Sequence, residues 1–227
     1  MTQSRILLFI ILGEISMIDV SVIIPYHQDR GYLFDAIESY EAQEFTGTSE
    51  LILSHNPLFT LGQNFNAGVA KAKGKYIKVL PDDDLLTPNC LQDLFDKAEQ
   101  EQADVVFANA RNFHSDGGIS FEREGILTSK FANISLSSLL ESNFIHGPTV
   151  LYRTKMFQDI GGFDESLWTA EEYEFHLRCL HQGYKFVYLP QVVFDYRIWP
   201  SSKSVQYRLS KAEARENLII SIKERFQ

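Results

Sequence analysis

The sequence predicts an α/β fold with a doubly wound, mainly parallel sheet flanked by helices, followed by a C-terminal helical tail. Short β-branched runs alternate with segments of helical periodicity over the first half of the chain, as in parallel strands joined by right-handed crossovers. The strand-like runs are apolar at successive positions, which is typical of strands covered on both faces. A chain of 227 residues with 44% hydrophobic content is long enough to bury one sizeable core.

Each expected element has its own signal. Val20 to Ile24 is a β-branched run that Pro25 ends, which indicates a central strand. Gly74 ends the helix before the third strand, and Thr87 followed by Pro88 predicts an N-cap and a first helical residue. In order, the elements expected in this half are strand 20–24, helix 31–43, strand 51–53, helix 61–73, strand 76–80, helix 88–102 and strand 104–108.

The second half begins with weak periodicity between residues 111 and 144, where Asp116-Gly117-Gly118 predicts a turn. The elements expected in this half are helix 136–140, strand 149–152, helix 155–160, helix 170–181, strands 186–188 and 192–196, and an amphipathic tail over 204–226. Leu209, Ala212 and Ile219 are the apolar positions of that tail. The tail is expected to dock either on its own domain or on a second subunit, which would make a homodimer.

The first residues are expected to form an appendage to the folding unit. Their apolar run, Ile6 to Leu12, is too short to cross a bilayer and is not followed by a small-residue cleavage pattern. Met17 directly precedes the first predicted strand. The expected division is therefore an appendage over residues 1–17, a main domain over 18–204 and an amphipathic helix over 205–227.

The composition excludes some partners. A formal net charge of −9 argues against nucleic acid or an anionic membrane surface as the main partner. Cys90 and Cys179 lie far apart inside expected helices without a metal-type pairing, which predicts two buried thiols in a reducing, cytoplasmic compartment. Basic residues of the tail leave open a peripheral contact with the inner face of a membrane. They are Lys211, Arg215, Lys223 and Arg225.

The third expected strand ends in three consecutive carboxylates, Asp82, Asp83 and Asp84. Ligands of open α/β sheets bind beyond the carboxyl ends of the strands. Because strand side chains alternate, Asp83 is expected to point away from its two neighbours, and the set could hold a hard cation such as Mg²⁺ or Mn²⁺. The alternative is that these acids are solvated loop residues or helix caps, but Thr87 and Pro88 already begin the next helix.

Several motifs, taken in order, carry a resemblance to a known family. They are Val22-Ile23-Ile24-Pro25, the segment 64–77, Asp82-Asp83-Asp84, Gly161-Gly162-Phe163-Asp164-Glu165, Glu171-Glu172-Tyr173-Glu174 and Tyr196-Arg197-Ile198-Trp199-Pro200. Together they resemble the family 2 glycosyltransferases with a GT-A fold, over about residues 18–204. The resemblance implies a hexosyltransferase-type enzyme that moves a sugar, with inversion, from a nucleotide-sugar to an acceptor. The implied donor is a UDP-sugar, and the implied acceptor is a saccharide or lipid-linked molecule in surface polysaccharide biosynthesis.

The resemblance also implies roles for particular residues. The family's acidic pair matches Glu171 and Glu172, with Glu172 as the general base. The alternative is that both acids only interact with the dipole of the helix they begin. A divalent ion, Mg²⁺ or Mn²⁺, held by Asp83 with Asp82 or Asp84 nearby, would neutralise the nucleoside diphosphate leaving group. Residues expected to contact the donor are Pro25, Tyr26, His27, Asn56, Asn64, Lys71, Asp82 and Arg197.

Two departures from the family pattern leave alternatives open. Ser54-His55-Asn56-Pro57 stands where the family has an acid that contacts the nucleobase, and Trp199 stands where many relatives have a metal-binding histidine. An indole N–H cannot bind a cation, so water and phosphate oxygens would complete the site, unless His146 replaces the ligand. Trp199 itself either covers the sugar or acceptor or packs under the tail. The alternative to an active transferase is a catalytically weakened module for sugar-nucleotide binding or assembly.

Overall fold

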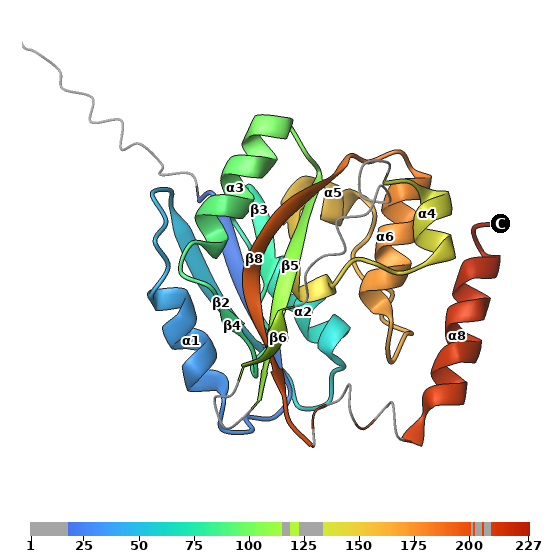
Figure 1. The fold of residues 1–227 in the computed structure, drawn as a ribbon, viewed down its shortest axis with the longest axis horizontal. Helices are drawn as coiled ribbons and strands as arrows, with labels where there is room; N and C mark the ends of the chain where they lie inside the picture. The colour runs from blue at the N-terminus through green and yellow to red at the C-terminus, as the bar shows by residue number, and fades with distance from the viewer. Residues whose placement is uncertain (1–17, 115–118, 123–133, 201, 203–205, 207–209) are drawn as a thin grey trace, which may run out of the picture.

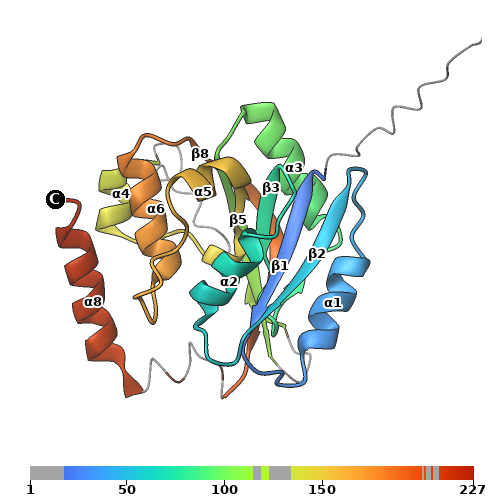
Figure 2. The ribbon, with the colours of Figure 1, turned by 180° about the vertical axis from the view of Figure 1, so that it is seen from behind.

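The computed structural model describes residues 18–114, 119–122, 134–200, 202, 206 and 210–227. Within these residues the chain forms one eight-stranded sheet with helices on both of its faces (Figures 1 and 2). The appendage expected over residues 1–17, the turn expected over residues 116–118 and the tail contact expected at Leu209 lie outside the described residues.

The sheet has the strand order β2-β1-β3-β7-β5-β8-β4, and β6 pairs with β5 beside this path. The strands are β1 Val20–Tyr26, β2 Ser49–His55, β3 Tyr76–Val79, β4 Leu85–Leu86, β5 Val105–His114, β6 Ile119–Glu122, β7 Leu151–Arg153 and β8 Phe186–Ile198. β1 is parallel to β2 and β3, and β5 is parallel to β8. β7 lies antiparallel between β3 and β5, so that β5 again has the direction of β1. The long strands thus share one direction, opposed in the described chain by the short strands β4, β6 and β7, which confirms the mainly parallel sheet.

Helices cover the two faces of the sheet in two groups. The helical elements are α1 Leu33–Glu41, α2 Leu61–Val69, α3 Cys90–Glu101, α4 Leu136–Glu141, the 3₁₀-helix η1 Gly147–Thr149, α5 Thr154–Asp159, α6 Glu171–His181 and α8 Ala212–Glu224. α1 and α3 share one hydrophobic core with the sheet, and α2, α5 and α6 share another (Figures 1 and 2). The doubly wound arrangement that the alternating pattern predicts is therefore confirmed.

Alternate residues of the central strands supply the two cores. Ile23 packs into the core under α2 and α6, whereas its neighbours Val22 and Ile24 pack into the core under α1 and α3. All three are fully buried, as expected for a strand covered on both faces. Cys90 and Cys179 are buried free thiols, one in each core, so the prediction of two buried thiols is also confirmed.

Several boundary predictions are wrong: α2 ends at Val69 and not at Gly74, β5 runs on to His114, and two further boundaries differ for local reasons. Helix α3 begins at Cys90 with Asn89 as its N-cap, because residues before it form a turn in which the Cys90 N–H donates to the Thr87 carbonyl oxygen at 3.0 Å. The two strands expected over 186–188 and 192–196 are one strand, β8. A shift in register against β5 accommodates the residues between them, so the strand continues through Pro190.

The tail helix α8 docks on its own domain. Ile222 is its buried contact, and Ile219 packs beside the core as expected. Arg225 holds the end of the helix through ion pairs with Glu174 (3.0 Å) and Asp164 (3.7 Å). The prediction of an apolar contact at Ala212 is wrong, because the N-terminal turns of α8 are exposed. Across the described residues, no helix has the length and apolar character needed to span a bilayer.

We expect His176, on the buried face of α6, to make the fold sensitive to acid. It is fully buried, hydrogen-bonded to the Tyr152 hydroxyl at 2.8 Å, and burial lowers its pKa to about 3. As the pH falls below the ordinary histidine pKa of about 6.5, His176 is therefore protonated in the unfolded chain but stays neutral in the folded chain. This group's contribution to stability is complete above that pH and declines as the pH approaches 3.

The measurement is urea unfolding at several pH values, compared between the wild type and His176→Gln, which keeps a hydrogen-bonding side chain but does not titrate. The free energy of unfolding of the wild type should fall more steeply, by up to about 1.4 kcal/mol per pH unit between pH 6 and 4. His181→Gln, on an exposed position of the same helix, should leave the wild-type slope intact. Equal slopes for wild type and His176→Gln would contradict a buried neutral imidazole.

Candidate active site

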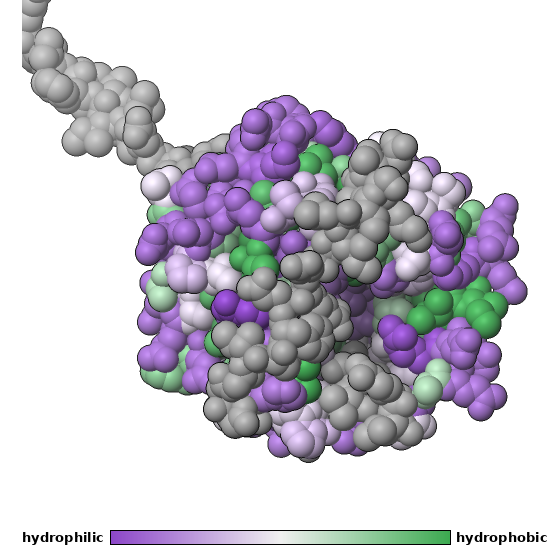
Figure 3. Space-filling model, in the orientation of Figure 1, coloured by the Kyte–Doolittle hydropathy of each residue, from purple (hydrophilic) through white to green (hydrophobic). Residues whose placement is uncertain are grey.

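A cleft of about 1530 Å³ lies at the carboxyl ends of β1 and β3, between the sheet and helices α2, α6 and α8. Figure 3 shows it as a hollow beside the apolar surface of α8. Six of the residues predicted for the site line the cleft, namely His27, Asp82, Asp83, Asp84, Glu171 and Glu172. The acidic turn and the acidic pair are far apart in the sequence, and the fold brings them to one cavity.

Other predicted donor contacts lie outside the cleft lining. They are Pro25, Tyr26, Asn56, Asn64, Lys71 and Arg197. Tyr26 stacks on His55, with ring centroids 4.5 Å apart, and Asn64 donates to the Asn56 carbonyl oxygen. Lys71 follows the C-terminal end of α2, whose N-terminal end lines the cleft, so the helix length of roughly 15 Å separates it from the cavity.

The acidic segment is a turn and not a continuation of the strand. β3 ends at Val79, and the Asp84 N–H donates to the Pro81 carbonyl oxygen at 3.2 Å. Arg30, which the sequence analysis did not identify, lies 2.7 Å from Asp82 Oδ1 and 3.4 Å from Asp83 Oδ2. The predicted alternation is therefore wrong: Asp82 and Asp83 converge on one guanidinium, and Asp84 turns away.

Arg197 supports this turn from behind. Its backbone N–H donates to Asp84 Oδ1 at 2.7 Å, and its Nε donates to the Asp83 carbonyl oxygen at 2.8 Å. Its guanidinium also reaches Asp35 at 2.9 Å and lies over the ring of Tyr32. The side chain of Arg197 is buried, and its Nε and one terminal nitrogen bind the protein, so the donor contact expected for Arg197 stays a prediction that this arrangement does not favour.

Burial shapes the charges of the acidic turn. The pKa of Asp82 is raised to about 6 by burial, against the opposing effect of the Arg30 charge. Burial and the neighbouring Asp83 carboxylate raise the pKa of Asp84 well above its ordinary value. Lys78 on β3 is fully buried nearby, and the loss of solvation lowers its pKa to about 8. Asp83 is the most accessible carboxylate of the three.

Trp199 contacts the acidic turn directly. Its indole Nε1 donates to Asp83 Oδ2 at 2.9 Å, and the Arg30 guanidinium lies over its ring at 5.2 Å. The alternatives considered for Trp199 therefore missed its contact with the very carboxylate expected to bind a metal. The sequence offered no signal for it, because the contact joins the end of β8 to a turn more than a hundred positions earlier.

The carboxylates of this turn fit a hard cation that takes part of its coordination from the substrate. Asp83 is accessible from the cleft, and Asp82 Oδ2 is buried without a hydrogen-bond donor from the described chain. Carboxylate oxygens are the ligands that Mg²⁺ and Mn²⁺ prefer. In the described ranges, no three His, Cys, Asp or Glu side chains form a cluster that could hold a metal. His146, the expected replacement ligand, lines the cleft with its ring against Tyr196.

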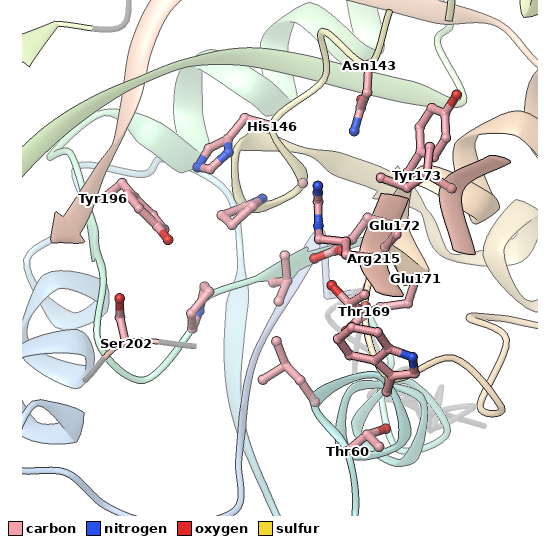
Figure 4. Close-up of a pocket in the computed structure, with 18 of the residues that line it drawn as sticks. Thr60, Asn143, His146, Thr169, Glu171, Glu172, Tyr173, Tyr196, Ser202 and Arg215 are labelled. Carbon is pink, nitrogen blue, oxygen red and sulfur yellow. The ribbon is translucent and has the colours of Figure 1, made fainter. Parts of the chain in front are cut away.

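The acidic pair stands at the first turn of α6. Ala170, which precedes the pair, has left-handed backbone angles (φ 62°), a conformation that costs a non-glycine residue on the order of 1 kcal/mol. Glu171 is buried against Gly62, and Glu172 is half-buried against Gly147. Figure 4 shows Glu171, Glu172 and Tyr173 on one side of the cleft, with His146 and Tyr196 on the other.

The comparisons with known proteins agree with this architecture. The model of the family described as glycosyl transferase family 2 matches residues 49–161, from β2 through α5, and so includes the acidic turn but not Glu171 and Glu172. The uncharacterized glycosyltransferase MJ1057 of Methanocaldococcus jannaschii is 26% identical, over 88% of this chain and 77% of that protein. The uncharacterized glycosyltransferase EpsJ of Bacillus subtilis is 29% identical, over 60% of this chain and 42% of that protein.

Solved structures show the same fold. The crystal structure of Staphylococcus aureus TarS 1–349 in complex with UDP-GlcNAc has a TM-score of 0.65 and 17% identity, and the similarity covers 82% of this chain. The chain spans 60% of that TarS chain and 63% of a Rickettsia typhi glycosyltransferase. The TarS structures show a GT-A-like fold, and the family model together with the curated relatives shows that the chain belongs to the family 2 glycosyltransferases.

Proposed function

We propose that this protein transfers a sugar from a nucleotide-sugar donor to a hydroxyl group of an acceptor. The observation that carries the proposal is the meeting of two acidic groups in one cleft. The turn Asp82–Asp84 suits the diphosphate end of a donor, and the pair Glu171–Glu172 suits the attacking hydroxyl. One cavity thus offers both the stabilisation of a leaving group and a base.

A UDP-sugar is the proposed donor. TarS, whose fold this chain shares, forms complexes with UDP-GlcNAc and with UDP in its crystal structures. In this chain the loop after β1 lines the same cleft through His27, Gln28 and Arg30. A nucleotide at the carboxyl ends of β1 and β3 would follow the general rule for open α/β sheets.

A divalent cation is proposed to stabilise the diphosphate as it leaves. Asp83 and Asp82 would hold Mg²⁺ or Mn²⁺, whose charge would stabilise the departing nucleoside diphosphate. Arg30 already neutralises part of the negative charge of this turn. Trp199 fixes the rotamer of Asp83 through the indole N–H, so the carboxylate is oriented before a donor binds.

Glu172 is proposed to be the general base. It accepts the proton of the acceptor hydroxyl while that oxygen forms a bond to the anomeric carbon and the bond from this carbon to the diphosphate oxygen breaks. Attack from the face opposite the leaving group inverts the anomeric configuration. The half-buried position of Glu172 on the cleft wall, with Tyr173 anchoring the helix behind it, supports this role over that of a helix-dipole partner.

The acceptor is proposed to be a saccharide or lipid-linked molecule of surface polysaccharide biosynthesis, used at the cytoplasmic face of a membrane. Helix α8 supports this class of acceptor because it presents both apolar and basic side chains to the cleft. Ile219 and Ile220 are apolar, and Arg215 and Lys223 are basic, which suits a hydrophobic chain that carries a phosphate.

Asp83→Asn should abolish metal-dependent turnover while the fold remains intact. The amide removes the charge but keeps an oxygen that accepts from the Trp199 indole. With a panel of UDP-sugars and Mn²⁺, UDP release should fall on the order of a hundredfold or more. Calorimetric titration of Mn²⁺ with UDP should show that binding is lost. Asp159→Asn, at an exposed ion pair on α5, serves as the control and should retain both properties. Metal-dependent release by Asp83→Asn would place the metal elsewhere.

Glu172→Gln should lower kcat by about a hundredfold or more, because a general base typically contributes 10²–10⁴ to the rate. The KM for the UDP-sugar should stay the same, since the residue faces the acceptor. Glu171→Gln is the matched comparison and should cost less. A larger loss at Glu171 would transfer the role of base to that residue. Binding of UDP-sugars without turnover by the wild type would instead support a weakened binding module.

A further inference from the structure

We propose that Gly147 is a positioning residue for Glu172. Its missing side chain reserves the space in which the Glu172 carboxylate lies. The proposal rests on the proposed function, since Gly147 affects catalysis only if Glu172, for which it leaves room, is the general base. Gly147 lies in η1, between the sheet and the first turn of α6, and lines the cleft together with Glu172.

The structure leaves no room for a β-carbon at position 147. A Cβ on Gly147 would lie 2.8 Å from Glu172 Cγ, 3.0 Å from Cδ and 3.0 Å from Oε1. Carbon atoms that are not bonded do not approach so closely. Gly147 is not one of the glycines with positive φ, so its backbone angles do not require glycine. The requirement is one of space, and the atoms that occupy the space belong to the proposed base.

The turn that carries Gly147 is held in place and cannot retreat from Glu172. The buried Lys78 ammonium donates to the carbonyl oxygens of Pro148 and Val79, which ties η1 to the end of β3. Thr149 Oγ1 donates to the His146 carbonyl oxygen at 2.7 Å and accepts from a backbone N–H of β5. A side chain at position 147 would therefore displace Glu172 and not the turn.

Helix α6 is equally fixed, so only the Glu172 side chain can yield. Tyr173, the next residue, is buried, and its hydroxyl donates to the Leu139 carbonyl oxygen at 3.1 Å. The flexible glutamate side chain can rotate away without unfolding the protein. The expected result of a Cβ at position 147 is thus an intact fold with a misplaced carboxylate.

The chain contains a matched control for this effect. Gly62, on α2, faces the other member of the acidic pair, and a Cβ there would lie 3.5 Å from Glu171 Cγ. That distance is an ordinary van der Waals contact, and alanine is favoured over glycine inside a helix. Gly62→Ala therefore adds the same methyl group beside a neighbouring glutamate without displacing it.

The test is a comparison of Gly147→Ala and Gly62→Ala in UDP release from a panel of UDP-sugars with Mn²⁺, with water or a simple saccharide as acceptor. Gly147→Ala should lower kcat on the order of a hundredfold, the loss associated with a misplacement of about 1 Å, with the KM for the UDP-sugar unchanged. Gly62→Ala should retain the wild-type kcat. Added to Glu172→Ala, Gly147→Ala should cause no further loss, because the two changes act through one group.

Two results would overturn the proposal: a wild-type kcat in Gly147→Ala, or a further loss when it is added to Glu172→Ala. Thermal melting of the wild type, Gly147→Ala, Glu172→Ala and the double variant measures the contact without using activity. The decrease in Tm that Gly147→Ala causes should shrink when Glu172 is already alanine, and an equal decrease in both backgrounds would contradict the overlap. If the wild type released no UDP, the proposed function would fail while the melting cycle still decided the placement of Glu172.

Discussion

The cleft depends on the attachment of the acidic turn to the end of β8. Arg197, near the end of β8, donates to the turn through its backbone N–H and Nε, and Trp199, just after the strand, donates through its indole N–H. Carboxylates beyond a strand repel one another and would spread without such donors. Since β8 pairs with β5 along its length, the position of the turn is set by the whole sheet.

Local patterns in the sequence were sufficient for most of the long elements and for the acids of the cleft, but not for the short elements β4, β6 and η1. The β-branched run from Val20 to Ile24 and the start of a helix at residue 61 follow from neighbouring residues, and both are present. The acidic turn and the Glu171–Glu172 pair were recognised as motifs, and both line the cleft. Each of these features depends only on residues that lie within a few positions of one another in the sequence.

The errors concern partners that only the folded chain brings together. Arg197 was expected to contact the donor, but in the fold its Nε donates to the Asp83 carbonyl oxygen and a terminal nitrogen donates to Asp35. The alternation expected through the three aspartates failed because the strand pairing of β3 ends before they begin. Arg30 was missed because a single arginine in a loop carries no sequence signal until its carboxylate partners are known.

Lys78 ties two parts of the cleft together, and this restricts how the chain can vary. Its side chain is fully buried, and a buried charge is tolerated only when it has good hydrogen-bond partners. The carbonyl oxygens of Val79 and Pro148 are these partners. An apolar replacement would leave those carbonyl oxygens without their donor, and a new residue at Pro148 would have to present its carbonyl in the same direction. Substitutions at positions 78, 147 and 148 are therefore expected to covary in related chains, although the positions lie in two distant segments.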